Sequence, residues 1–254
     1  MRILDAPMGT RLIDEFSVAP KDVLFASLER PELVRALHRR DVEAGAEIVL
    51  TNTFALPFRA GSLSDAEIAA LAEAAIGHAM AAGAKAVHIS LGPAMLPVAT
   101  ESAALVQRVL TCIRPAVKRT RSGIWFESLS ISDLDWLVNV TSTLASAEIL
   151  SAACFIAGDE GDRLWSRLAD LGHLWALGFN CSRRLPGDAG FDAALEKTAA
   201  AWSAALLAPG QCRVAKPAKP SPDLLRSLPA RFDLAGVCCG GSSADLRALA
   251  GGGA

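Results

Sequence analysis

Short apolar runs alternate with longer amphipathic stretches from one end of the chain to the other. Eight apolar runs lie at residues 2–4, 47–50, 86–90, 124–126, 149–156, 174–179, 213–215 and 234–237. Several of them are apolar at nearly every position, which is typical of strands that are buried on both faces of a parallel sheet. We therefore predict eight strands in one parallel sheet.

A stretch with helical character follows each predicted strand. Residues 31–44 have proline in the first turn and end before Gly45, and residues 64–82 open with the capping box Ser-Asp-Ala-Glu and end before Gly83. Further helices are predicted at 101–120, 132–145, 162–171, 191–207, 220–228 and 242–250. Strands that alternate with helices in this way predict an α/β fold, a single-domain (β/α)8 TIM barrel over residues 1–250 with a flexible tail at 251–254. The alternative, an open doubly wound sheet, lacks its usual glycine-rich phosphate loop after the first strand.

The composition narrows the class of protein. With 254 residues, 52% hydrophobic residues and a formal net charge of −2, the chain can build a large core and has no basic block of the kind that binds nucleic acid. We find neither a secretory signal nor an apolar stretch of about 18 residues, so no membrane span is expected. We therefore expect a cytoplasmic protein whose six cysteines are mostly reduced. Clustered cysteines in that compartment indicate metal binding or catalysis.

Polar and metal-binding residue types gather where the predicted strands end. Because the active face of a TIM barrel lies at the carboxyl ends of its strands, these residues are expected to meet on one rim. They are Asp5 after the first strand, Thr51 and Asn52 after the second, Glu127 after the fourth, Cys181 after the sixth, and Cys238 and Cys239 after the eighth. Thr51 and Asn52 either contact the substrate or satisfy backbone groups at the rim, and Asn180 is expected to orient the turn at Cys181.

Three cysteines are a natural ligand set for a catalytic zinc ion. Zinc prefers tetrahedral thiolate ligation, and a catalytic site keeps the fourth position open for water or substrate. Cys181, Cys238 and Cys239 would hold Zn2+ in this way, and an incoming thiol would bind as the thiolate because zinc lowers its pKa. The thiolate would then attack an activated methyl group. Asp5 and Glu127 would form charge-assisted hydrogen bonds with the ammonium group of an amino-acid substrate.

Short segments spread over nearly the whole chain carry a family resemblance. They are Ile3-Leu-Asp-Ala-Pro-Met-Gly-Thr10, Thr51-Asn-Thr-Phe54, Phe126-Glu127, Gly178-Phe-Asn-Cys-Ser182 and Gly236-Val-Cys-Cys-Gly-Gly241. The sequence resembles the homocysteine S-methyltransferase family, which includes betaine- and S-methylmethionine-dependent enzymes and the homocysteine domain of cobalamin-dependent methionine synthase. The resemblance implies a (β/α)8 barrel, a three-cysteine zinc site, and homocysteine as the acceptor that is methylated to methionine. It also implies that Asp5 and Glu127 bind the amino group of homocysteine.

Three departures from the family pattern bear on the methyl donor. Residues 239–243 read Cys-Gly-Gly-Ser-Ser where the family has Cys-Gly-Thr-Thr or Cys-Arg-Thr-Thr, residues 214–219 read Val-Ala-Lys-Pro-Ala-Lys where a Tyr-Pro-Asn-x-Gly motif is usual, and the chain has no tyrosine. Three hypotheses follow. The protein is a complete methyltransferase with a small onium donor such as S-methylmethionine, S-adenosylmethionine or a betaine; or it is a homocysteine-activating subunit that receives its methyl group from a corrinoid-carrying protein; or it is a zinc- and homocysteine-binding barrel without catalysis.

Overall fold

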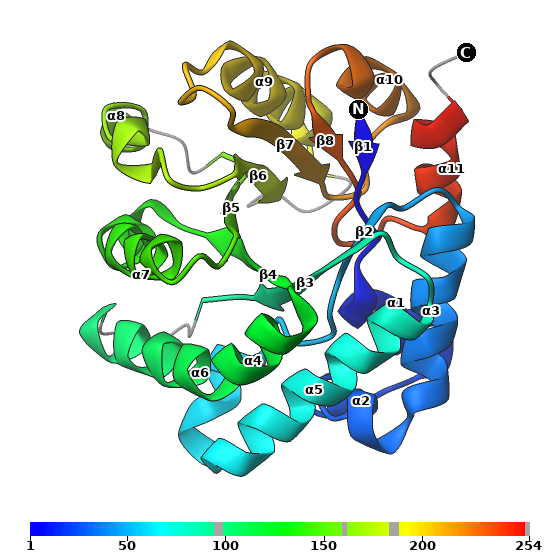
Figure 1. The fold of residues 1–254 in the computed structure, drawn as a ribbon. Coiled ribbons are helices and arrows are strands. Elements are labelled where there is room, and N and C mark those ends of the chain that lie inside the picture. Colours follow the sequence, from blue (N-terminus) through cyan, green and yellow to red (C-terminus); the bar gives the residue numbers. More distant parts are fainter. Residues whose placement is uncertain (94–98, 159–161, 183–187, 252–254) are drawn as a thin grey trace.

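The apolar runs of the sequence form eight parallel strands in the computed structural model, which describes residues 1–93, 99–158, 162–182 and 188–251. The strands are β1 (Arg2–Ile3), β2 (Ile48–Leu50), β3 (Ala86–Leu91), β4 (Gly123–Leu129), β5 (Ser151–Ile156), β6 (Ala176–Cys181), β7 (Cys212–Pro217) and β8 (Leu234–Ala235). Their order in the sheet is β1-β8-β7-β6-β5-β4-β3-β2, and a bridge between Leu4 and Ile48 joins the two ends. The chain therefore forms the predicted (β/α)8 TIM barrel as a single domain, and not an open sheet (Figure 1).

Helices surround the strands on all sides (Figure 1). They are α1 (Met8–Phe16), α2 (Ala26–Glu29), α3 (Pro31–Glu43), α4 (Leu56–Arg59), α5 (Asp65–Ala81), α6 (Ala99–Thr120), α7 (Leu134–Ser146), α8 (Asp162–Trp165), α9 (Phe191–Ala204), α10 (Pro222–Ser227) and α11 (Ser243–Gly251). The predicted capping box is present, because the Ser64 hydroxyl accepts a hydrogen bond from the Glu67 amide and the Glu67 carboxylate accepts one from the Ser64 amide. The single helix predicted at 162–171 is wrong, since α8 ends at Trp165 and a separate 3-10 turn covers Leu168–Leu171.

Side chains of the strands alternate between the inside of the barrel and the helix layer. Trp125 packs inside the barrel with Val214, whereas its neighbour Phe126 packs outside against the helices. His88 stacks on Trp175 and meets Trp125 edge-on, with ring centroids 5.5 and 5.8 Å apart. Because these large side chains fill the barrel towards the amino ends of the strands, room for a ligand is left at the carboxyl ends.

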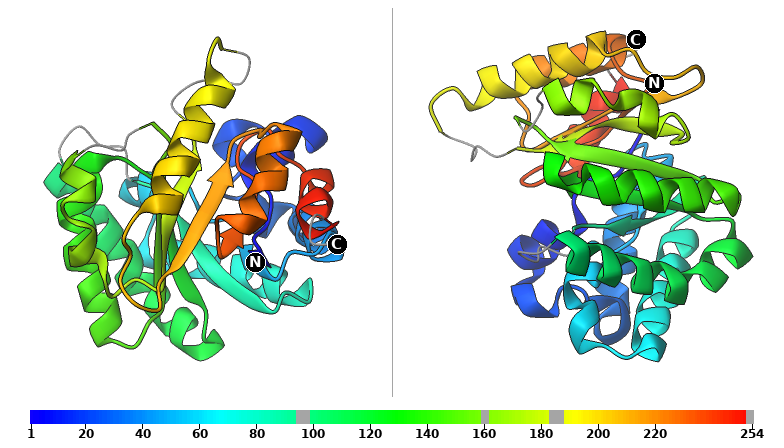
Figure 2. Two further views of the ribbon diagram at one scale, coloured as in Figure 1. Left: turned by 90° about the horizontal axis from the view of Figure 1, so that it is seen from above. Right: turned by 90° about the vertical axis from the view of Figure 1, so that its left-hand side faces the viewer.

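The first strand and the last helix lie next to each other. The last helix, α11, packs beside the first strand, β1 (Figure 2). Of the tail predicted at 251–254, Gly251 is the last residue of α11 and the other three lie outside the described residues. None of the helices in the described part of the chain is long and apolar enough to cross a membrane.

Candidate metal centre and substrate pocket

The three cysteines predicted as metal ligands meet at the carboxyl ends of β6 and β8. Cys181 is the last residue of β6 and has a left-handed backbone (φ 56°), and Cys238 and Cys239 follow β8. The Cys239 sulfur lies 3.7 Å from that of Cys181 and 3.9 Å from that of Cys238, and all three lie within 4.8 Å of one another. Zinc–sulfur bonds of about 2.3 Å at tetrahedral angles place sulfurs about 3.8 Å apart. The three side chains therefore fit a single tetrahedral metal ion.

The backbone around the adjacent cysteines is fixed by neighbouring strands and by two glycines. The Cys238 amide donates a hydrogen bond to the Pro217 carbonyl at 2.8 Å, which ties the end of β8 to the end of β7. Gly240 adopts a left-handed conformation (φ 77°) that ends this segment in a turn. A Cβ atom at Gly236 would lie 2.9 Å from the Asp5 carbonyl oxygen, so only glycine lets β8 approach the segment after β1 this closely.

The two predicted carboxylates lie at the other end of the same site. Asp5 Oδ2 accepts a hydrogen bond from the Leu50 amide at 2.7 Å. Glu127 Oε2 accepts one from the Ser90 hydroxyl at 2.6 Å, and Asn180 Nδ2 lies 3.4 Å from Glu127 Oε1. Both carboxylates are therefore held in place by groups from neighbouring strands before any ligand binds.

Strand β4 does not end at Glu127, as the sequence predicts, but continues to Leu129. The pairing with β5 shifts register between Phe126 and Leu129, and Ser128 has a positive φ of 56°. Asn180 stabilises this bulge, because its Oδ1 accepts a hydrogen bond from the Ser128 amide at 2.9 Å. Because of this bulge, the side chain of Glu127 lies in the site at the carboxyl ends of the strands although the residue is inside β4.

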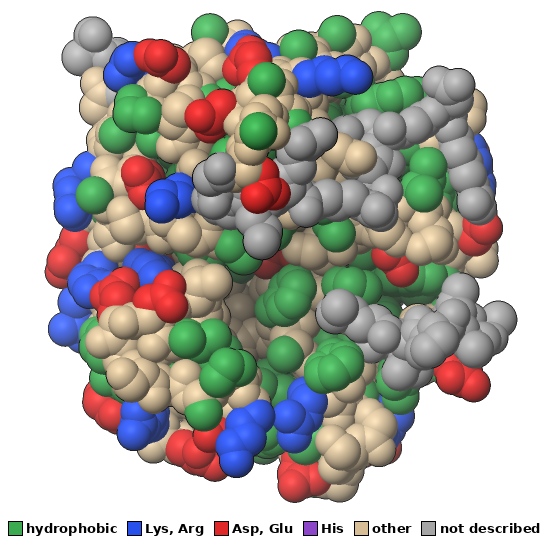
Figure 3. Space-filling model, turned by 180° about the vertical axis from the view of Figure 1, so that it is seen from behind, with side chains coloured by type: hydrophobic (Ala, Val, Ile, Leu, Met, Phe, Trp, Pro, Cys, Tyr) green, Lys and Arg blue, Asp and Glu red, His purple; other side chains and the backbone are tan. Residues whose placement is uncertain are grey.

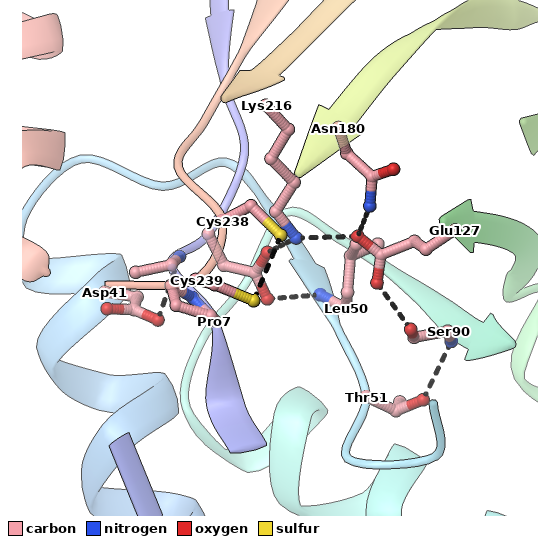
Figure 4. A network of polar contacts seen from close by, with 12 residues as sticks. Pro7, Asp41, Leu50, Thr51, Ser90, Glu127, Asn180, Lys216, Cys238 and Cys239 are labelled. Atoms are coloured by element: carbon pink, nitrogen blue, oxygen red, sulfur yellow. Dashed lines mark hydrogen bonds and ion pairs between the residues drawn. The ribbon is translucent and has the colours of Figure 1, made fainter. Parts of the chain in front are cut away.

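A third charged side chain, Lys216, forms ion pairs with both carboxylates, and Figure 4 shows it beside Glu127. Its Nζ is 3.1 Å from Asp5 Oδ1 and 3.1 Å from Glu127 Oε1, and the side chain is only 4% exposed. The sequence prediction assigned no role to this residue. Strand alternation was the available signal, because Val214 faces the barrel interior and the residue two positions later faces the same side.

The charges in the site shift one another's proton affinities. Burial raises the pKa of Asp5 to about 7, although the Lys216 ammonium acts to lower it. Burial acts to lower the pKa of Lys216, but the carboxylates of Asp5 and Glu127 outweigh this and raise it above its ordinary value. The hydrogen bond with Cys238 raises the pKa of Cys181 to about 12. Without a metal the thiols therefore keep their protons at neutral pH, so that a metal must displace them.

A cavity of about 230 Å³ connects the cysteine end with the carboxylate end. Cys238, Cys239 and Lys216 line it, together with the first residues of α1 and the ring of Phe54. Figure 3 shows the face that carries the carboxyl ends of the strands, with a hollow near its centre that hydrophobic side chains border. The arrangement can therefore bring a small ligand to Cys238 and Cys239 and to the charged cluster at once.

The sequence profile of the homocysteine S-methyltransferase family matches residues 2–251. The chain belongs to this family. Among solved structures, the homocysteine methyltransferase MmuM from Escherichia coli matches in its oxidized form with a TM-score of 0.77 at 22% identity, over 98% of this chain and 95% of that one. Its metallated form matches with a TM-score of 0.74 at 22% identity over the same shares, which at such identity supports the fold alone. A search of curated protein sequences gave no match.

In this member of the homocysteine S-methyltransferase family, the other predicted site residues, Thr51, Asn52 and Asn180, form hydrogen bonds within the protein. Thr51 and Asn52 line the cavity. The Thr51 hydroxyl accepts a hydrogen bond from the Ser90 backbone amide at 3.2 Å, and the side-chain amide of Asn52 donates one to the Val23 carbonyl at 2.7 Å. Their polar groups thus bond to the protein, and contact with a substrate stays a prediction. Asn180, expected to orient the turn at Cys181, uses its side chain on β4 instead.

Proposed function

We propose that the protein is a zinc-dependent methyltransferase that methylates the sulfur of an acceptor thiol of the homocysteine type, with homocysteine itself giving methionine. Cys181, Cys238 and Cys239 would hold Zn2+. The observation that supports this most directly is the spacing of the three sulfurs, 3.7 and 3.9 Å between neighbours, at the edge of a cavity large enough for a small ligand. The protein belongs to a family of methyltransferases that act on this acceptor, and a metallated form of MmuM is among the matching structures.

Zinc in this site would supply an open fourth position at which the acceptor sulfur stays a nucleophilic thiolate at neutral pH. The protein positions the rest of the acceptor, with Asp5, Glu127, Thr51 and Asn52 proposed to line its subsite. The acceptor sulfur then forms a bond to the methyl carbon while the bond between that carbon and the donor breaks. The site needs no general base, because the thiol proton leaves when the acceptor binds. The proposal also requires a reducing compartment, which fits our expectation of a cytoplasmic protein.

For the methyl donor we propose a small onium compound rather than a methyl group carried on a corrinoid protein. Phe54 lines the same cavity as Cys239 and is 42% exposed, so an aromatic ring is available to a ligand in that cavity. Aromatic faces attract sulfonium and quaternary ammonium groups through the ring quadrupole. The donor would leave as a neutral thioether or tertiary amine, which binds less well to the same face.

A donor screen with zinc-replete protein tests the proposal. Homocysteine is offered with S-methylmethionine, S-adenosylmethionine or glycine betaine, and methionine is measured by mass spectrometry alongside the zinc content. We expect about one zinc per chain and methionine from at least one donor. Cys239→Ser should lose both zinc and turnover, whereas Cys154→Ser, a buried cysteine inside the barrel, serves as the matched control and should keep both. Full zinc retention in Cys239→Ser would refute the metal site, and turnover only with a methylated corrinoid protein would refute the donor.

A further inference from the structure

The acceptor subsite contains a cation that belongs to the protein itself. Asp5, Glu127 and Lys216 have side chains that are 2%, 9% and 4% exposed, and they come from three different strands or strand ends. The Lys216 ammonium lies 3.1 Å from an oxygen of each carboxylate. This is the place that an ammonium group would take if Asp5 and Glu127 together were to bind one. The cluster is therefore already a complete ion pair network without a ligand.

The four carboxylate oxygens have little capacity left for a second cation. Asp5 Oδ2 accepts from the Leu50 amide, and Glu127 Oε2 accepts from the Ser90 hydroxyl. Glu127 Oε1 accepts from Lys216 at 3.1 Å. Asp5 Oδ1 makes no hydrogen bond, but it is buried and faces the Lys216 ammonium as an ion pair, so a ligand in the cavity does not reach it.

Displacement of Lys216 by a substrate ammonium group is unfavourable. Among the ion pairs of the described residues, Asp5 and Glu127 are the only anionic partners of Lys216. A lysine pushed out of this position would leave a buried charge unpaired, which costs more than the new pair returns. If Lys216 stays, the substrate ammonium meets a like charge at close range in a poorly solvated site.

The local sequence explains why the lysine points here. Residue 216 pairs with Asn180 of β6, whose side chain also contacts Glu127, and Pro217 pairs with Cys181 at the end of the same ladder. The inward position next to the metal ligands is therefore fixed by strand register. It lies in the segment 214–219, where the sequence departs from the family pattern.

We propose that Lys216 takes the place of a substrate ammonium group, so that the preferred acceptor is a thiol whose chain carries no charged amino group beside the two carboxylates. The chemistry at sulfur is unchanged, and this inference rests on the function proposed above. It assigns to Lys216 the role of a specificity-determining residue. Homocysteine would then be a weaker ligand than the thiol that has the same chain without the amino group, 4-sulfanylbutanoate.

Calorimetric titration of the zinc-replete protein with these two thiols tests the proposal without relying on turnover. We expect 4-sulfanylbutanoate to bind the wild type about 10-fold or more tightly than homocysteine, because one hydrogen bond to a charged group typically changes a dissociation constant by at least about 10-fold. Lys216→Met, which keeps the length of the side chain and removes its charge, should shift the ratio of the two dissociation constants toward homocysteine by about 100-fold or more. Lys216→Arg is the matched control, since it keeps the cation and should keep the wild-type preference.

The outcomes separate this inference from the proposed function. Wild-type protein that binds homocysteine as tightly as 4-sulfanylbutanoate, or more tightly, overturns the role of Lys216 while the zinc-dependent function stands. If neither thiol binds zinc-replete protein, the proposed function fails and the inference fails with it. Lys216→Met leaves two buried carboxylates without a cation. If this variant does not fold, the ratio of the two dissociation constants measured with wild-type protein decides the question alone.

Discussion

Asp5→Asn should change how the stability of the protein depends on pH. Asp5 is 1% exposed, and burial raises its pKa to about 7 in spite of the lysine beside it. A carboxyl group whose pKa is higher in the folded than in the unfolded protein holds its proton more tightly when folded. As the pH rises from about 4 to about 7, the unfolded chain loses this proton first. The free energy of unfolding of the wild type should therefore fall across that window.

The magnitude follows from the two pKa values. The pKa of Asp5 in the folded protein is about 7 against an ordinary value of 3.8, a difference of about 3. One pKa unit is about 1.4 kcal/mol, so the ionised Asp5 disfavours the folded state by on the order of 4 kcal/mol relative to its protonated form. Asparagine cannot ionise, so this loss should be missing from Asp5→Asn. The variant should gain stability relative to the wild type by up to that amount between pH 4 and pH 7.

Urea unfolding of metal-free protein at several pH values measures the difference. Burial lowers the pKa values of His38 and His88 to about 3 and about 4, and both residues make the protein less stable as the pH falls below about 6.5. This opposing trend is common to both proteins and cancels in their difference. Asp14→Asn, at an exposed position of α1, controls for the loss of a negative charge. A constant difference between Asp5→Asn and wild type from pH 4 to 7 would show that Lys216 fully compensates the burial of Asp5.

Three further predictions concern the metal, the donor and the scaffold. Because the thiol pKa values are raised, apparent zinc affinity measured against a chromophoric chelator should rise steeply from pH 6 to 8, and a flat profile would exclude the thiols as ligands. Phe54→Leu should raise the KM for an onium donor roughly 5-fold or more and leave acceptor binding unchanged in calorimetry; equal KM values would remove the aromatic contact from the proposal. Asp41→Ala should destabilise the protein by about 3–5 kcal/mol in urea, because it strands Arg11, which donates to Asp41 at 2.8 and 2.5 Å in the interior. Glu15→Ala, which breaks an exposed pair, should cost about 1 kcal/mol or less, and similar costs for both would contradict the argument from burial.

The order of strands and helices was predictable because the apolar runs and the amphipathic stretches can be read directly from the sequence. All eight strands lie where apolar runs occur, since strands buried on both faces need apolar residues on both faces. Helix α5 was predictable for a local reason, its capping box. Helix α1 was not, because Pro7 at its N-cap provides no side-chain hydrogen bond and the sequence therefore lacks the usual start signal.

The site residues that follow directly after a predicted strand could be identified from the sequence. The cysteines and the two carboxylates came together because the carboxyl ends of parallel strands share one rim. Lys216 was missed for a specific reason. The predicted strand stopped at residue 215, where the apolar run ends, whereas β7 continues to Pro217. An error of two residues at a strand end thus hid the one cation of the charged cluster.

The two proposals together assign opposite preferences to the two ends of the cavity: a cationic methyl donor is favoured at the metal end, and an ammonium group on the acceptor is disfavoured at the carboxylate end. Three thiolates around a divalent ion would carry a formal charge of −1. A positively charged methyl donor in the cavity would therefore be attracted to the metal end. At the other end Lys216 is committed to Asp5 and Glu127, so an ammonium group on the acceptor gains little there and meets a like charge. If both proposals hold, the cavity accepts a cationic donor because the metal end is negative, and an acceptor without an ammonium group because Lys216 already neutralises the carboxylate end.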